Sequence, residues 1–224
     1  MVQSTTLPAD ICIIFDMDGT LVDSETLCNQ AYLDLVPDIG LTLEAMVREH
    51  SGRRLAHIVA DIEERVGRKL PVSFETDYRA HVAALFDTHL KPVPGVPEML
   101  AALEFPKCVA SNAPRRKISH AMQVSGLAEH FTGAIFSAYD IDAWKPDPGV
   151  FLHAAREMGY PREACIVVED SPTGVEAADR AGMKVFQYLP RRDMSATGKA
   201  TGFHHMDDLA PKITAHLASV SQRR

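Results

Sequence analysis

Cysteine is scarce in this sequence, and the 4 cysteines that it contains form no C-x-x-C pair. Structural zinc sites and disulfide frameworks need cysteines in number and at short spacings, so neither is predicted. Cys12, Cys108 and Cys165 lie in apolar, strand-like runs, and we expect them to be buried and reduced. The setting of Cys28 is left open.

Long hydrophobic runs are also missing. No apolar segment approaches the roughly 18 residues that a membrane-spanning helix needs. Residues 1–10 lack the basic stretch and apolar core of a secretory signal. We therefore expect a protein of the cytoplasm with no membrane partner.

Basic charge is in deficit, with 23 Lys and Arg against 30 Asp and Glu and a formal net charge of −7. The basic residues are scattered apart from short groups such as Arg53-Arg54, so nucleic acid is not an expected partner. The remaining composition, 46% hydrophobic and 24% charged over 224 residues, is ordinary for a globular protein. It suits one large domain, or a domain with a smaller insert, and we expect a monomer.

Short apolar runs alternate with segments of helical spacing along much of the chain. The strand-like runs are residues 11–15, 108–110, 134–136, 165–168 and 184–186, and clear helical spacing occurs at 150–158 and 175–181. Runs that are apolar throughout are typical of strands buried on both faces of a parallel sheet. The alternation therefore predicts a doubly wound, Rossmann-like α/β fold.

Residues 24–90 interrupt this alternation because they contain no convincing strand. Helical patterns instead cover 26–35, 55–66 and 74–90. The segment 91–97 holds three prolines and a glycine, which favour a linker. We predict a core domain of 1–22 and 92–224 with a helical cap of 23–91, and the polar tail after Arg191 gives no pattern.

Polar residues follow directly after several of the predicted strands. They are Asp16 and Asp18, then Ser111 and Asn112, then Glu169 and Asp170. Ligands of an open α/β sheet bind beyond the carboxyl ends of its strands, so these side chains should meet at one edge. Carboxylates without Cys or His suit Mg²⁺, and an anionic substrate such as a phosphate ester would complete the site.

Four ordered segments carry a family resemblance. They are Phe15 to Asp23, Ser111-Asn112, Lys145-Pro146 and Glu169 to Gly174. In order and spacing they resemble the motifs of haloacid-dehalogenase-like hydrolases. The helical insert after the first motif is similar to that of the subfamily containing phosphoglycolate phosphatase and β-phosphoglucomutase.

The resemblance implies that Asp16 is a nucleophile that forms an aspartyl-phosphate, and that Asp18 is the general acid and base. It also implies Mg²⁺ as cofactor, held by Asp16, the backbone carbonyl of Asp18, Glu169 and Asp170. Whether Glu169 binds the metal directly or through water is left open.

The resemblance further implies that Lys145 neutralises the nucleophile and a phosphate oxygen, and that Ser111 and Asn112 belong to the phosphate cradle. Arg53 and Arg54 follow a Ser51-Gly52 turn in the cap, where they would face the substrate's leaving group. Longer segments around 108–112 and 139–148 resemble those of bacterial 6-phosphogluconate phosphatases, which implies a phosphorylated sugar acid as substrate.

Simpler interpretations exist for single residues. Ser111 could cap a helix, Lys145 and the cap arginines could be solvated, and His57 is expected at the surface or in cap packing. Asp18 argues for an oxygen leaving group, against dehalogenases and phosphonatases. A phosphomutase of the β-phosphoglucomutase type stays an alternative, as does a non-catalytic protein that binds a phosphorylated ligand.

Overall fold

The computed structural model describes residues 11–50 and 53–222, so the Ser51-Gly52 turn lies outside the described residues. Its centre is a parallel sheet of 6 strands in the order β3-β2-β1-β4-β5-β6. The strands are β1 Cys12–Phe15, β2 Lys107–Ser111, β3 Ile135–Ser137, β4 Cys165–Glu169, β5 Lys184–Tyr188 and β6 Thr201–Phe203. The predicted strands are therefore all present.

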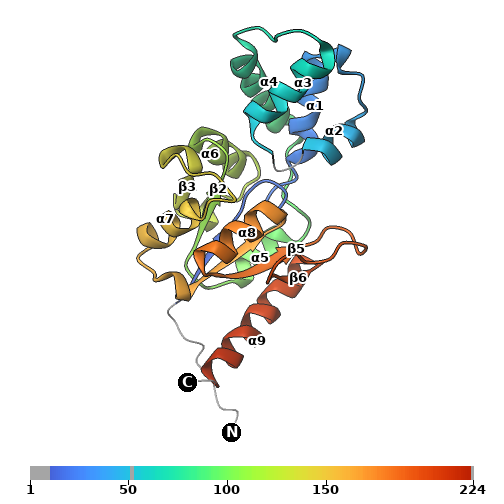
Figure 1. The fold of residues 1–224 in the computed structure, drawn as a ribbon. Helices are drawn as coiled ribbons and strands as arrows, with labels where there is room; N and C mark the ends of the chain where they lie inside the picture. The colour runs from blue at the N-terminus through green and yellow to red at the C-terminus, as the bar shows by residue number, and fades with distance from the viewer. Residues whose placement is uncertain (1–10, 51–52, 223–224) are drawn as a thin grey trace.

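Helices cover both faces of the sheet (Figure 1). One face packs on α5 Val96–Ala102, α6 Arg115–Val124 and α9 Leu209–Ser221, and the other on α7 Gly149–Met158 and α8 Pro172–Ala181. Alternate side chains of β1 divide between the two faces, since Ile13 and Phe15 belong to one apolar cluster and Cys12 and Ile14 to the other. The predicted doubly wound α/β fold is confirmed.

A helical lobe follows β1, above the sheet in Figure 1. It contains α1 Glu25–Leu35, α2 Leu43–His50, α3 Leu55–Val66 and α4 Phe74–His89. Its interior is aromatic: the Tyr32 and Tyr78 rings stack with centroids 4.3 Å apart, and Phe74 stacks on both. The lobe coincides with the predicted insert, and the boundaries at 22/23 and 91/92 stay a prediction.

Short 3-10 helices complete the chain at Pro37–Ile39, Ala128–His130, Ala138–Asp140, Arg162–Ala164 and Met206–Asp208. No helix in the described part of the chain is long and apolar enough to cross a membrane. Cys12, Cys108 and Cys165 are buried and unpaired as expected, and Cys28 is half-buried on α1.

Two regions hold more structure than their sequence patterns indicate. The expected linker 91–97 ends inside α5, whose first turn contains Pro97, a position where a missing N–H costs no helical hydrogen bond. The tail after Arg191 holds β6 and α9. Leu209, Ile213 and Leu217 recur every four residues and bury one side of α9 against the sheet domain.

Candidate active site

Asp16 lies where β1 ends, between two neighbouring strands. Its backbone N–H donates to the Val168 carbonyl at 2.9 Å, which extends the pairing of β1 with β4 up to the carboxylate. The chain runs from β1 outward to β2 and β3 on one side, and β4 to β6 lie on the other. Ligands of doubly wound sheets bind at such a switch in strand order.

Lys145 joins two carboxylates at this point. Its ammonium donates to Asp16 Oδ1 at 2.5 Å and to Glu169 Oε1 at 2.9 Å. The side chains of Lys145, Asp16 and Glu169 are only 4%, 9% and 1% exposed. Burial alone would lower the pKa of Lys145, but the two carboxylates raise it above its ordinary value, so it carries its charge.

Glu169 and Asp170 are fixed by residues near them in the fold. Glu169 Oε2 accepts hydrogen bonds from the backbone N–H of Ser171 at 2.6 Å and from its hydroxyl at 2.9 Å. Asp170 Oδ1 accepts one from Thr20 at 2.9 Å. Ser171 also caps α8, by accepting from the Gly174 N–H at 3.0 Å.

Two glycines make room for these carboxylates. Gly19 has a φ of +82°, and a Cβ there would collide with the Asp170 carboxylate. A Cβ at Gly174, in the first turn of α8, would overlap the Glu169 carboxylate. A larger residue at either position would displace the acidic side chain, because the carboxylates pack directly against the glycine backbone.

Asp16, Glu169 and Asp170 form an acidic cluster whose ligand oxygens all lie within 4.8 Å of one another. Burial, with the charges of Glu169 and Asp18, raises the pKa of Asp16 to about 7, although Lys145 opposes the shift. Burial and the charges of Glu169 and Asp16 raise the pKa of Asp170 well above its ordinary value. Since carboxylate oxygens are hard ligands and the cluster has excess negative charge, these residues fit a divalent cation such as Mg²⁺.

Asp18 has a different environment from Asp16, although both carboxylates face one cavity. Its Oδ1 accepts a hydrogen bond from Lys117 Nζ on α6 at 2.8 Å and a very short one from the Ser24 hydroxyl. The side chains of Asp18 and Lys117 are 28% and 25% exposed. Asp18 is thus accessible to a ligand in the cavity.

Ser111 and Asn112 lie at the end of β2, next to the Lys145 loop. Asn112 Oδ1 accepts a hydrogen bond from the Lys145 backbone N–H at 2.9 Å, so Asn112 helps to place the lysine. Ser111 is buried, and its hydroxyl accepts from the Ala113 N–H at 3.1 Å. The cap of α6 is Pro114, so Ser111 does not cap that helix.

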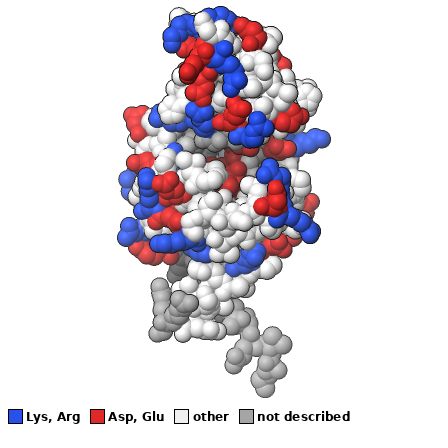
Figure 2. Space-filling view, turned by 45° about the vertical axis from the view of Figure 1, so that its right-hand side comes forward, with Lys and Arg blue, Asp and Glu red and all other residues white. Residues whose placement is uncertain are grey.

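One cavity of about 1280 Å³ connects all of these groups. Figure 2 shows the hollow where the helical lobe meets the sheet domain, with acidic side chains inside it and basic ones on its rim. Every site residue predicted from the sequence lines this cavity: Asp16, Asp18, Arg53, Arg54, Ser111, Asn112, Lys145, Glu169 and Asp170.

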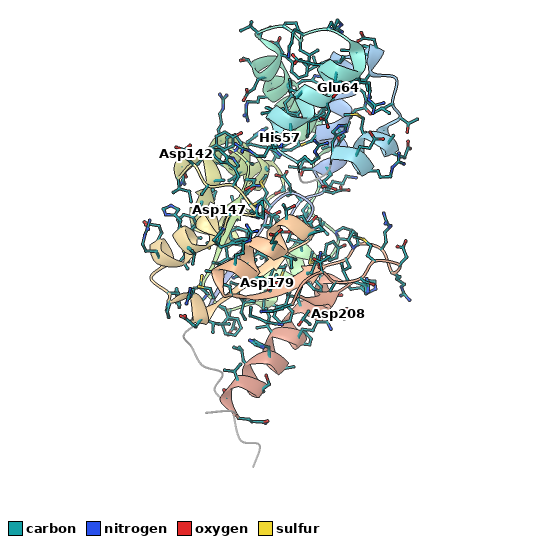
Figure 3. The ribbon with its side chains drawn as sticks, viewed as in Figure 1. His57, Glu64, Asp142, Asp147, Asp179 and Asp208 are labelled. Atoms are coloured by element: carbon teal, nitrogen blue, oxygen red, sulfur yellow. The ribbon has the colours of Figure 1, made fainter. Side chains whose placement is uncertain are left out.

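The two cap arginines differ in their partners. Arg53 forms an ion pair with Asp61 on α3 at 2.5 Å. Arg54 forms no ion pair with a carboxylate of the described residues, and its guanidinium lies 4.2 Å from the centre of the Trp144 ring in the core. His57, on the same helix, is exposed as expected, and Figure 3 places it on the side of α3 nearest the core.

Several residues that shape the site are absent from the sequence-based set. Lys117 contacts Asp18, and Thr20 holds Asp170. Trp144 receives Arg54, and Tyr139 accepts a hydrogen bond from Arg79 of α4 at 3.3 Å. Signals for them exist in the sequence: Thr20 lies inside the segment Phe15 to Asp23, Tyr139 and Trp144 lie inside 139–148, and Lys117 stands early in the helix that follows β2, near the active edge of the sheet.

Comparison with known proteins agrees with this arrangement. The family model of haloacid dehalogenase-like hydrolases matches residues 12–182. The chain is 38% identical to 6-phosphogluconate phosphatase of Escherichia coli over 202 residues. The matched region covers 88% of this chain and 91% of that protein. It is 30% identical over 190 residues to a phosphorylated carbohydrates phosphatase of Thermotoga maritima, covering 77% of this chain and 82% of the relative.

The fold also matches solved structures. A haloacid dehalogenase-like protein from Agrobacterium tumefaciens superposes with a TM-score of 0.79 at 29% identity, covering 92% of this chain and 99% of that one. The protein is thus an enzyme, a hydrolase whose curated relatives include phosphatases. With four motifs meeting in one cavity and a family model matching from β1 to the end of α8, the chain belongs to the haloacid dehalogenase-like hydrolase family.

Proposed function

We propose that the protein is a Mg²⁺-dependent phosphatase that hydrolyses small phosphorylated sugars or sugar acids, 6-phosphogluconate among them, through an aspartyl-phosphate. The observation that carries the proposal is that Asp16 and Asp18 line one cavity and have different surroundings. Asp16 belongs to a buried acidic cluster beside Lys145, whereas Asp18 is accessible and held by Lys117 and Ser24. Two carboxylates in distinct environments suit two distinct roles.

Asp16 would act first, as the nucleophile. One of its oxygens forms a bond to phosphorus as the bond from phosphorus to the substrate oxygen breaks. Lys145 holds Oδ1 of Asp16, and no residue of 11–50 or 53–222 forms a hydrogen bond with Oδ2. This leaves Oδ2 available for the attack.

Asp18 would serve both half-reactions. Its carboxyl group donates a proton to the departing substrate oxygen, and the resulting carboxylate then removes a proton from the water that attacks the aspartyl-phosphate. The second step releases inorganic phosphate and restores both aspartates. Proton transfer of this kind accelerates reactions by roughly 10² to 10⁴.

The acidic cluster of Asp16, Glu169 and Asp170 would hold Mg²⁺, with the carbonyl oxygen of Asp18 as a further ligand. The cation, when bound, supplies positive charge that offsets the repulsion between the nucleophile and the substrate phosphate. Lys145 contributes a second positive charge beside Asp16. Ser111 and the side-chain amide of Asn112 would bind phosphate oxygens where β2 ends.

Substrate choice would come from the cap. Arg54 lines the cavity without a carboxylate partner in the described residues, so its guanidinium can pair with a sugar-acid carboxylate. Arg53 is already paired with Asp61 and would contribute less. The two relatives named above, which act on 6-phosphogluconate and phosphorylated carbohydrates, support this substrate class.

A phosphate-release screen tests the proposal. The purified enzyme with Mg²⁺ is offered 6-phosphogluconate, neutral sugar phosphates, phosphoglycolate, nucleotides and pyrophosphate. We expect release of phosphate, with the largest kcat/KM for a sugar or sugar-acid phosphate. Release from none of them would contradict the proposal, and conversion of a sugar phosphate into its positional isomer without release would identify a mutase instead.

A further inference from the structure

The two aspartates of the site share a pattern of hydrogen bonds. Asp16 Oδ1 accepts from Lys145, and Asp18 Oδ1 accepts from Lys117. In the described part of the chain, neither Oδ2 atom takes part in a hydrogen bond. Each carboxyl group is therefore anchored through one oxygen by a lysine, while its other oxygen is open to the cavity's contents.

Lys117 reaches Asp18 from a separate element of the fold. It extends from α6 of the core to the loop after β1, and its ammonium lies 5.6 Å from the centre of the Phe86 ring on α4 of the cap. Ser24, directly before α1, supplies the second donor to the same Oδ1. Two donors on one oxygen, from two separate elements of the fold, fix the carboxyl plane more firmly than either alone.

We propose that Lys117 is a positioning residue for proton transfer by Asp18: with Ser24 it holds Oδ1, so that Oδ2 exchanges the proton with the leaving oxygen and then with water. This inference rests on the proposed function. Lys117 touches no reacting atom in this scheme. It acts by keeping one orientation of the Asp18 carboxyl group populated, because catalysis by an acid or base depends on correct placement.

The two half-reactions depend on Asp18 to different degrees, and this difference provides the test. Cleavage of a sugar phosphate needs a proton for its poor leaving group, whereas p-nitrophenolate leaves without one. Attack of water on the aspartyl-phosphate needs Asp18 whichever substrate supplied the phosphoryl group. A displaced Asp18 should thus slow sugar phosphate cleavage and aspartyl-phosphate hydrolysis, and leave the first step with p-nitrophenyl phosphate intact.

The experiment is rapid-mixing kinetics of Lys117→Met with both substrates and Mg²⁺. With p-nitrophenyl phosphate we expect a fast burst of about one p-nitrophenolate per enzyme, followed by turnover roughly 10 to 100 times slower than in the wild type. With the sugar phosphate, kcat should fall by a similar factor without a burst, and KM should change by less than about threefold. Lys117→Arg should recover most of the loss, because a guanidinium can also donate to Oδ1.

Two further variants keep the test decisive. Ser24→Ala removes the other donor to Asp18 Oδ1 and should give the same burst followed by a smaller loss of turnover. It provides the test if Lys117→Met folds poorly. Arg115→Gln removes one positive charge from the same helix, where Arg115 pairs with Asp140 at the surface, and should behave as wild type. Unchanged rates in Lys117→Met, or a first step slowed equally for both substrates, would overturn the positioning role. A wild-type enzyme that hydrolyses neither substrate would instead overturn the proposed function itself.

Discussion

Lys145 at the sheet edge and Arg53 in the cap are both paired with carboxylates, but their surroundings differ. The Lys145 side chain is 4% exposed and bridges Asp16 and Glu169, whereas Arg53 and Asp61 are 40% and 42% exposed. Removing one partner of a buried pair is strongly destabilising, while an exposed pair contributes only about 0 to 1 kcal/mol. We therefore expect the sheet edge to keep one arrangement for every substrate, whereas the proposed dependence on the substrate lies with the cap.

Substitutions in the two regions should have different effects. A substitution at the sheet edge should reduce activity on every phosphate ester by the same factor. A substitution in the cap should reduce activity on some esters only.

The largest effect is expected for Asp16→Asn, because an amide of nearly equal size is a very poor nucleophile. We predict a loss of more than about 10³-fold in kcat for every substrate, with the fold retained. Steady-state phosphate release, with circular dichroism to confirm the fold, measures this. An Asp16→Asn variant that keeps more than about a tenth of the activity would exclude covalent catalysis by Asp16.

The next effect concerns the metal. Asp170→Asn removes one charge from the acidic cluster but keeps a hydrogen-bond acceptor for Thr20, so the Mg²⁺ concentration for half-maximal activity should rise by about 10² or more. Chelation should abolish wild-type activity and Mg²⁺ should restore it. Ca²⁺, which takes more ligands at longer distances, should inhibit. Full activity after exhaustive chelation would rule out the metal site.

A selective effect is expected in the cap. Arg54→Ala should lower kcat/KM for a sugar-acid phosphate by roughly 10 to 100-fold, the scale of a lost hydrogen bond to a charged group. The kcat/KM of Arg54→Ala for p-nitrophenyl phosphate should stay within about threefold of the wild-type value. Arg53→Ala is the matched control. Because the Arg53 guanidinium is paired with Asp61, kcat/KM for the sugar-acid phosphate should fall by about threefold or less. Equal losses on both substrates for Arg54→Ala would show that its contact with Trp144 serves closure of the cap instead.

The smallest effect is on stability and depends on pH. Because the pKa of Asp16 rises from 3.8 to about 7 on burial, its neutral form favours the metal-free fold at low pH, and this contribution is lost as the pH rises through about 7. The Tm of the metal-free enzyme should therefore fall as the pH rises from about 4 to about 7 and level off above that. Since Mg²⁺ competes with that proton, it should raise Tm more at pH 8 than at pH 6. Thermal unfolding measures this. A larger rise in Tm on adding Mg²⁺ at pH 6 than at pH 8 would contradict the raised pKa of Asp16.

The site in the core could be predicted from the sequence because its functional side chains directly follow the apolar strands. Each apolar run is followed directly by the residues in question, such as Asp16 after β1 and Glu169 at the end of β4, and parallel strands bring these ends together. The insert was identified for a related reason, since helical spacing replaced the strand pattern. Both inferences depend only on residues that are close together in the sequence.

The contacts that the sequence did not reveal join segments far apart in the chain. Lys117 reaching Asp18 and Arg54 lying over Trp144 depend on how α6 and α3 face the cavity, which no local pattern specifies. β6 was missed because Thr201–Phe203 is a short strand at the edge of the sheet, with little apolar sequence of its own. The carboxylate partner of Arg53, Asp61, could have been suspected only once α3 was known to begin at Leu55.

In the proposed reaction the phosphoryl group passes through Asp16. The most direct measurement is to quench the enzyme in acid during turnover of a phosphate-labelled sugar phosphate and to locate the label by peptide mass spectrometry. We expect an acid-stable, hydroxylamine-sensitive phosphoryl group on Asp16 in the wild type, and none in Asp16→Asn. Continued turnover with no label on Asp16, or with the label on another residue, would contradict it.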